Sequence, residues 1–161
     1  SHDIPSGNEI YFDEFLSLVG PEEKLLAINI KSDGLAIPLK HAMKNYNPKN
    51  WFVFDMSIPD MKVHIAVGNP VFARMSEVES QIPWFDLVNG IWLDSFDDEW
   101  FDEDFIRDLI MQGKRVCVVS SELHDRNYLK LWKSLLSLSG NDSLILCTDH
   151  PEQAQKFFAG K

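Results

Sequence analysis

The chain of 161 residues carries a formal net charge of −10 at pH 7, and 45% of its residues are hydrophobic. This is enough apolar material for one core, and no linker divides the sequence, so we expect a single domain spanning residues 1–161. The negative charge argues against nucleic acid or an anionic membrane as partner, because both require a basic face. A phosphorylated ligand would need a local cation.

The chain shows no sign of a membrane span or a signal peptide. It lacks a run of about 18 apolar residues, and its first residues have neither a basic nor an apolar region. Cys117 and Cys147 lie within apolar, strand-like runs, which favours buried free thiols over a disulfide. We therefore expect a soluble protein in a reducing, cytoplasmic setting.

Short apolar runs alternate with segments of helical periodicity along the whole chain. The runs predict strands at 24–31, 51–57, 71–76, 90–95, 115–120 and 143–149. The segments between and after them predict helices at 35–43, 61–67, 77–85, 102–111, 126–138 and from Pro151 onward. The acidic residues before 102–111 are typical of a helix N-terminus and lack the spacing of a calcium loop.

Strict alternation of strands and helices predicts parallel strands, in either an open doubly wound sheet or a closed barrel. Polar residues stand at the C-terminal end of every predicted strand, and in a barrel these ends meet at one mouth. They include Asn29, Lys31, Asp55, Arg74, Trp92, Asp94, Ser120, Thr148 and Asp149. This distribution favours the barrel, although such a fold has eight strands and only six are visible.

Three short motifs resemble the glycerophosphodiester phosphodiesterases, a family of phosphatidylinositol-specific phospholipase C-like barrels. A His-Asp pair at 2–3 precedes a short predicted helix at 11–16. Residues 29–31 read Asn-Ile-Lys where the family typically has Glu-x-Lys, and residues 148–151 read Thr-Asp-His-Pro like its final-strand signature. The resemblance implies an α/β fold, a (β/α)8 TIM-type barrel truncated at its N-terminus, with six of eight units present.

The resemblance also implies metal-assisted hydrolysis of small phosphodiesters, an activity of lipid metabolism, with Mg²⁺ or Ca²⁺ as cofactor and two histidines as general acid and base. His2 matches the second histidine. The first histidine and the acidic metal ligands would lie upstream of Ser1, so we expect the isolated chain to be inactive or nearly so. Asn29 stands at the usual glutamate position, and its neutral amide is a weaker metal ligand.

Other candidate residues follow from charge and position. Lys31 and Arg74 carry cations that suit a phosphate group, and Trp92 is a candidate for stacking on a sugar or polyol. Glu122 and His124 lie just beyond the seventh strand of the inferred barrel, where we expect an orienting or specificity role. Helix capping and salt bridges at the rim remain an alternative explanation for the charged residues.

The sequence leaves several alternatives open. A non-catalytic module that binds a phosphorylated sugar or polyol would explain Asn29, and another barrel chemistry, such as phosphate-ester hydrolysis, is a third option. Six barrel strands would expose two apolar edges. These edges would be covered by an upstream segment or by a second copy in a homo-oligomer, or they would be absent in an open doubly wound sheet. The sequence does not identify the alcohol moiety or the metal.

Overall fold

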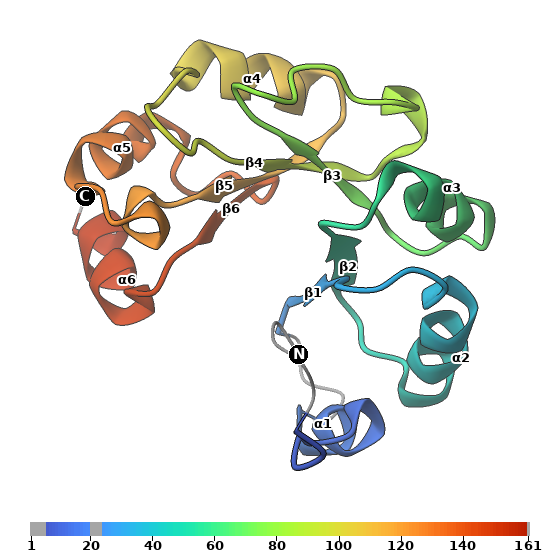
Figure 1. Cartoon of the computed structure of the whole chain (residues 1–161). Helices are drawn as coiled ribbons and strands as arrows, with labels where there is room; N and C mark the ends of the chain where they lie inside the picture. Colours follow the sequence, from blue (N-terminus) through green and yellow to red (C-terminus); the bar gives the residue numbers. More distant parts are fainter. Residues whose placement is uncertain (1–5, 20–23, 161) are drawn as a thin grey trace. The chain divides into compact units, whose positions relative to one another are not determined.

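The computed structural model describes residues 6–19 and 24–160 of the chain. These residues form two compact units, which divide between Phe72 and Ala73. Strands alternate with helices through both units (Figure 1).

The first unit contains a two-stranded parallel sheet, in which Leu26 lies opposite Trp51 and Asn29 lies opposite Phe54. Its core is centred on the second strand, where Phe52 and Val53 are fully buried. The Phe52 ring stacks on Phe72 with 3.8 Å between centroids. The elements are α1 (Phe12–Val19), β1 (Leu26–Asn29), α2 (Ala36–Tyr46), β2 (Trp51–Phe54) and α3 (Ile58–Ala66).

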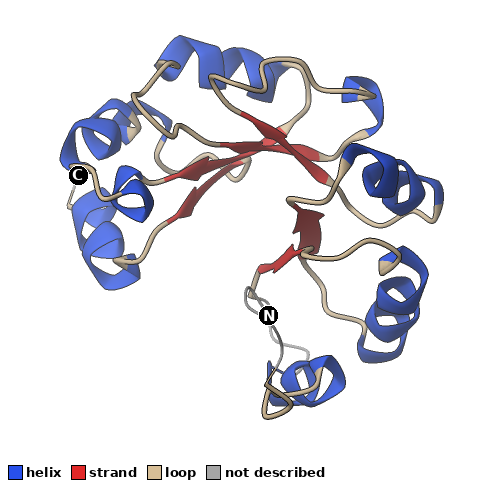
Figure 2. Cartoon of the chain, viewed as in Figure 1, coloured by secondary structure: helices blue, strands red, loops and turns tan. Residues whose placement is uncertain are grey.

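The second unit is built on a four-stranded sheet in the order β3-β4-β5-β6, and Figure 2 shows its strands alternating with helices. Strands β4 and β5 and strands β5 and β6 pair in parallel. The strands are β3 (Phe72–Met75), β4 (Gly90–Leu93), β5 (Arg115–Val119) and β6 (Leu144–Cys147). The helices are η1 (Phe85–Leu87), α4 (Glu103–Met111), η2 (Ser121–His124), α5 (Leu129–Ser134), η3 (Leu136–Leu138) and α6 (Pro151–Ala159).

Local sequence signals fix several helix ends. The Asp102 carboxylate accepts a hydrogen bond from the backbone N–H of Phe105 at 2.9 Å and so caps α4, which confirms the acidic stretch as a helix start. Ser57 caps α3 in the same way, with a 3.3 Å bond from the Asp60 N–H. Gly113 adopts a positive φ of 81° just after α4, a conformation that glycine adopts without strain.

All six predicted strands are present, and the fold is α/β with parallel strands. The structure shows separate sheets of two and four strands, consistent with an open α/β fold, and a closed barrel is not shown. The prediction of a helix at 77–85 was wrong. Ser76 and Glu79 instead form an isolated antiparallel bridge, and Pro83 disfavours helical backbone at the residue before it. The predicted helix at 126–138 is divided into α5 and η3.

Two expectations about the chain's environment can be compared with the structure. Within residues 6–19 and 24–160, no helix has the length and apolar character needed to cross a membrane. Cys117 and Cys147 are both free, with Cys117 buried and Cys147 partly buried. Burial raises the pKa of Cys117 and raises that of Cys147 to about 11, so both thiols stay protonated and unreactive at neutral pH.

The stacked Phe52–Phe72 pair predicts a large effect of truncation in the first unit. Phe52→Ala removes a fully buried ring and should lower the free energy of unfolding by about 3–5 kcal/mol. Urea unfolding followed by circular dichroism measures this loss. Val63→Ala, on the exposed side of α3, is the control and should change stability by no more than about 0.5 kcal/mol. Equal effects of the two changes would contradict this assignment of the core.

Candidate functional site

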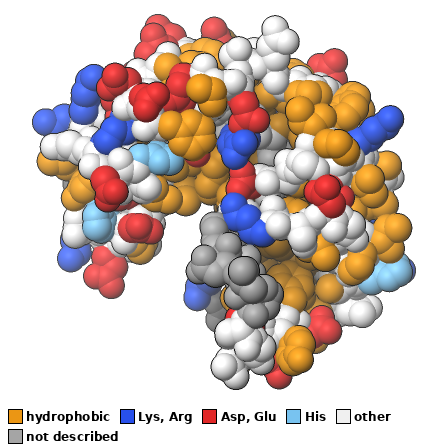
Figure 3. Space-filling model, viewed as in Figure 1, with side chains coloured by type: hydrophobic (Ala, Val, Ile, Leu, Met, Phe, Trp, Pro, Cys, Tyr) orange, Lys and Arg blue, Asp and Glu red, His pale blue; other side chains and the backbone are white. Residues whose placement is uncertain are grey.

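Polar side chains gather at the C-terminal ends of the strands in the second unit. We call this set the rim network: Glu77, Asp94, Ser95, Glu99, Ser121, Glu122, His124 and Arg126. In an open parallel sheet or in a barrel, this is the edge at which ligands bind. Figure 3 shows acidic side chains interspersed with basic ones and with histidine on the visible face of this unit.

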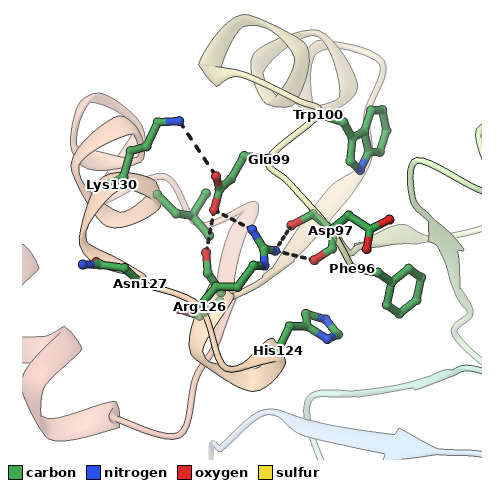
Figure 4. A network of polar contacts seen from close by, with 12 residues as sticks. Phe96, Asp97, Glu99, Trp100, His124, Arg126, Asn127 and Lys130 are labelled. Atoms are coloured by element: carbon green, nitrogen blue, oxygen red, sulfur yellow. Dashed lines mark hydrogen bonds and ion pairs between the residues drawn. The ribbon is translucent and has the colours of Figure 1, made fainter.

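Arg126 joins the segment after β4 to the segment after β5 (Figure 4). One terminal nitrogen donates to Glu99 Oε1 at 3.1 Å. The other donates to the backbone oxygen of Ser95 at 2.5 Å and to its hydroxyl at 3.0 Å. Ser121 adds a 2.8 Å bond from its hydroxyl to Glu99. Burial acts to raise the pKa of Glu99, but the Ser121 hydroxyl and the charge of Arg126 outweigh it and lower the pKa.

Glu77 also holds the segment after β4. Its Oε1 accepts hydrogen bonds from the backbone N–H groups of Phe96 and Asp97, both at 2.7 Å. Burial acts to raise the pKa of Glu77, but these two donors and the Arg126 charge outweigh it and lower the pKa. Glu77 is therefore ionised at neutral pH, and both Glu77 and Arg126 bond to segment 94–99.

His124 and Asp94 form a hydrogen-bonded pair at the rim. His124 Nε2 lies 2.7 Å from Asp94 Oδ1, which also accepts from the Ser95 N–H at 2.9 Å. The Asp94 side chain is 9% exposed, whereas the His124 side chain is 23% exposed. The Phe96 ring meets the imidazole edge-on at 5.2 Å. A histidine held by a buried carboxylate and reached by solvent is a group that can accept and return protons.

Glu122 links the ends of β5 and β6. Its carboxylate accepts hydrogen bonds from the hydroxyls of Ser120 and Thr148 and from the Asp149 N–H. Burial acts to raise its pKa, but these bonds outweigh it and lower the pKa. Both carboxylate oxygens accept hydrogen bonds from the protein. In this position, Glu122 therefore stabilises the rim network and has little capacity left to bind a ligand.

The first unit has a smaller polar group at its own strand ends. The Lys31 ammonium lies 2.5 Å from Asp55 Oδ2, and the two side chains are 35% and 15% exposed. Two residues earlier, the amide oxygen Oδ1 of Asn29 is buried and has no hydrogen-bond partner among the described residues. A buried oxygen in this state is a favourable position for a donor or cation from a ligand.

The sequence-predicted residues thus take different positions. His2 lies outside the described residues. Arg74 forms an ion pair with Glu79. Trp92 is buried at 7% exposure, so its ring as placed offers little area for stacking. Lys31 and Asn29 lie at the end of β1, while Glu122 and His124 lie in η2.

Sequence reasoning missed Arg126 and Glu99, which lie at the centre of the rim network. Arg126 was assigned only to the start of a helix, although it follows β5 closely, where barrel and open-sheet proteins carry ligand-binding residues. This position shortly after β5 is the sequence signal that could have identified Arg126 as a candidate residue. Its partner Glu99 lies 27 residues earlier in the chain, and no local pattern connects the two.

The described residues provide no set of ligands for the divalent cation implied by the resemblance. None of their His, Cys, Asp and Glu side chains forms a group of three or more able to hold a metal. At the end of β1 they supply one neutral oxygen, from Asn29, and a neighbouring carboxylate, Asp55, that is already paired with Lys31. A hard cation prefers six or more oxygen ligands, several of them charged. The described residues alone therefore do not fit such a site.

Comparison with models of known protein families and with curated protein sequences found no match to this chain.

The hydrogen bonds of Glu77 predict a pH-dependent effect on stability. Its folded-state pKa lies below the ordinary value of 4.5, so its stabilising effect is present above about pH 4.5 and is lost as the pH falls through the folded-state pKa. Glu77→Gln should lower the free energy of unfolding by about 1 kcal/mol at pH 7. Denaturation measured from pH 7 to pH 3 should show this difference shrinking below about pH 4.5. A constant difference would contradict the assignment.

Proposed function

We propose that the chain is part of a barrel-type hydrolase that cleaves small phosphodiesters, such as glycerophosphodiesters. The observation that carries this proposal is the polar group at the end of β1, where the Lys31 ammonium is held by Asp55 beside a buried, unpartnered Asn29 oxygen. The motif that contains Asn29 and Lys31 is also one of the three that resemble the phosphodiesterase family.

The position of Lys31 suits an anionic ligand. Its ammonium is a compact cation with three donors, of which Asp55 occupies one direction. With 35% of its side chain exposed, the remaining donors can reach a phosphate oxygen. Asp55 restricts where the ammonium lies, so less conformational entropy is lost when a ligand binds. Since the whole chain carries a charge of −10, this local cation supplies the attraction for a phosphodiester.

The proposal includes closure of the strands into a (β/α)8 barrel in the intact protein. Support comes from the strict alternation of strands and helices and from the polar residues at the strand ends. The resemblance adds Mg²⁺ or Ca²⁺ and His2 to this proposal. The described residues alone do not fit a cation site. The role proposed for Lys31 is therefore binding of the phosphate by its own ammonium group, without a bound metal.

Lys31→Met tests the proposed function in protein expressed from its complete reading frame. Loss of one charged hydrogen bond to phosphate should lower kcat/KM about 10- to 100-fold, measured with bis(p-nitrophenyl) phosphate and glycerophosphocholine. Lys44→Met, on the exposed face of α2, is the matched control and should retain full activity. His2→Ala tests the residue matched by resemblance, and full activity of that variant would remove His2 from the proposal. If the unaltered protein hydrolyses neither substrate, with or without divalent cations, the proposed function is wrong.

A second candidate is a non-catalytic module that binds a phosphorylated sugar or polyol. The neutral amide of Asn29, with its oxygen buried and unpartnered among the described residues, favours this function, because a ligand hydroxyl can donate to it. Asn29→Glu separates the two candidates. For a hydrolase, we expect calorimetry to show at least about tenfold tighter binding of Mg²⁺ or Ca²⁺, together with faster turnover.

The matched control for this substitution is Asn45→Glu on the exposed side of α2, which adds the same charge away from the strand ends. It should change neither cation binding nor turnover. Unchanged binding of glycerol phosphate by Asn29→Glu, with no turnover in either protein, would favour the binding module instead.

A further inference from the structure

We propose that His64 is a positioning residue for Lys31. Together with Asp60 and Asn69, this fully buried histidine fixes the turn between β1 and α2, which directly follows Lys31 (Figure 1). The inference rests on the proposed function, in which Lys31 binds the phosphate, and adds a residue that acts through it. All four residues belong to the first unit.

His64, Asp60 and Asn69 form a buried polar cluster, with exposures of 0%, 5% and 3%. His64 Nδ1 lies 3.0 Å from Asn69 Nδ2. His64 Nε2 lies 3.3 Å from Asp60 Oδ2, a close electrostatic contact that lacks the direction of a full hydrogen bond. Burial of polar groups costs free energy, and apolar side chains of similar volume often stabilise a core as well or better. A positioning role explains why this position is polar.

The Asn69 amide determines the state of the imidazole ring. Its nitrogen donates to the backbone oxygen of Ala36 at 3.0 Å, and a carbonyl oxygen can only accept. The same nitrogen is therefore the donor to His64 Nδ1, which leaves the ring proton on Nε2, facing Asp60. Burial lowers the pKa of His64 and outweighs the charge of Asp60, which acts to raise it. The neutral ring thus matches both of its neighbours.

Both neighbours of His64 hold the turn between β1 and α2. Asp60 Oδ1 accepts a hydrogen bond from the Gly34 N–H at 3.0 Å, and Asn69 donates to the Ala36 oxygen at the start of α2. Gly34 has a positive φ of 86°. Glycine suits this conformation but also gives the backbone wide freedom, so the bonds from the buried cluster are needed to fix the turn.

The chain just before this cluster orients Lys31 and the turn as well. Asp55 contacts the Lys31 ammonium at 2.5 Å, and Ser57 donates to Asp33 Oδ1 at 2.8 Å. With the two bonds from the cluster, the residues that follow β1 are held at four points. A segment fixed in advance loses less conformational entropy when a ligand binds. Loss of the cluster would release the turn and weaken binding through Lys31.

The first test is a double-mutant cycle of His64→Leu and Lys31→Met in protein expressed from its complete reading frame. His64→Leu removes both polar contacts and keeps a buried side chain. Alone, it should lower kcat/KM for bis(p-nitrophenyl) phosphate about tenfold, with kcat within about twofold, so that the loss is in KM. In the Lys31→Met background it should cost less than about twofold, because the residue through which it acts is gone.

Met61→Ala is the matched control for this cycle. Met61 is also buried in α3, at 4% exposure, so its truncation lowers stability without removing a bond to the turn. It should keep kcat/KM within about twofold. Equal losses from His64→Leu in both backgrounds would overturn the inference. The same holds if Met61→Ala and His64→Leu lower kcat/KM equally, because the effect would then be one of stability.

The second test observes the turn directly by NMR and needs no activity. The Gly34 N–H donates to a carboxylate, which shifts its proton resonance downfield and slows its exchange with solvent. We expect His64→Leu to move this resonance upfield and to speed the exchange at least about tenfold, whereas Met61→Ala should leave the shift unchanged. An unchanged Gly34 resonance in His64→Leu would overturn the inference. Asp60→Ala removes the acceptor itself and replaces His64→Leu in both tests if that variant does not fold.

The outcomes separate this inference from the proposed function. If the unaltered protein hydrolyses phosphodiesters and His64→Leu keeps its kcat/KM, the positioning role is wrong and the hydrolase assignment stands. If the unaltered protein hydrolyses none, the proposed function fails, and binding of glycerol phosphate is measured by calorimetry instead. Binding about tenfold weaker in His64→Leu then supports the positioning role, and equal results for the two proteins overturn it.

Discussion

The geometry of the rim network depends on the guanidinium of Arg126. It is the group that connects Ser95 and Glu99, after β4, with the segment that follows β5. A partly buried cation must be paired to be tolerated, and here its partners lie on one neighbouring segment. The same contacts pair both terminal nitrogens of the guanidinium and fix segment 94–99, on which Asp94 and Phe96 are presented to His124. The position of the imidazole follows indirectly from the position of the arginine.

The cations at the strand ends are each paired with a carboxylate, which follows from the acidic composition. Lys31 pairs with Asp55, Arg74 with Glu79 and Arg126 with Glu99. With 25 Asp and Glu residues against 15 Lys and Arg residues, carboxylates outnumber the basic side chains. The pairs orient the cations but also reduce their net attraction for an anion. A phosphodiester would therefore need to share a cation with its carboxylate, and Lys31, with much of its side chain exposed, is well suited to do so.

Asp94 and His124 differ from these ion pairs. A lysine or arginine paired with a carboxylate keeps its charge at every pH near neutrality, whereas histidine can take up or lose a proton there. The buried carboxylate orients the ring, and the opposite nitrogen faces outward. The residues around the pair, Glu77, Glu99 and Glu122, have lowered pKa values. They form a fixed negative frame around the hydrogen-bonded pair.

The sequence determined the elements of this protein. Short apolar runs predicted all six strands. The runs of β2, β4 and β5 are largely buried, as expected for parallel strands covered on both faces. The acidic stretch before α4 predicted its capped start. The failure at 77–85 has a local cause in Pro83, which disfavours helical backbone at the residue before it, and a tertiary cause as well. There, apolar spacing suggested a helix, but Glu77 is held by two backbone donors of segment 96–97.

Only the tertiary structure decided which polar residues meet. His124 and Asp94 lie 30 residues apart, and Arg126 and Ser95 lie 31 apart. Their contact depends on the register of β4 against β5, in which Leu93 lies opposite Val118. That register is set by side-chain packing across neighbouring strands, and it cannot be predicted from the spacing of residues along one strand. The strand-end positions of the candidate residues could therefore be read from the sequence, whereas their partners could not.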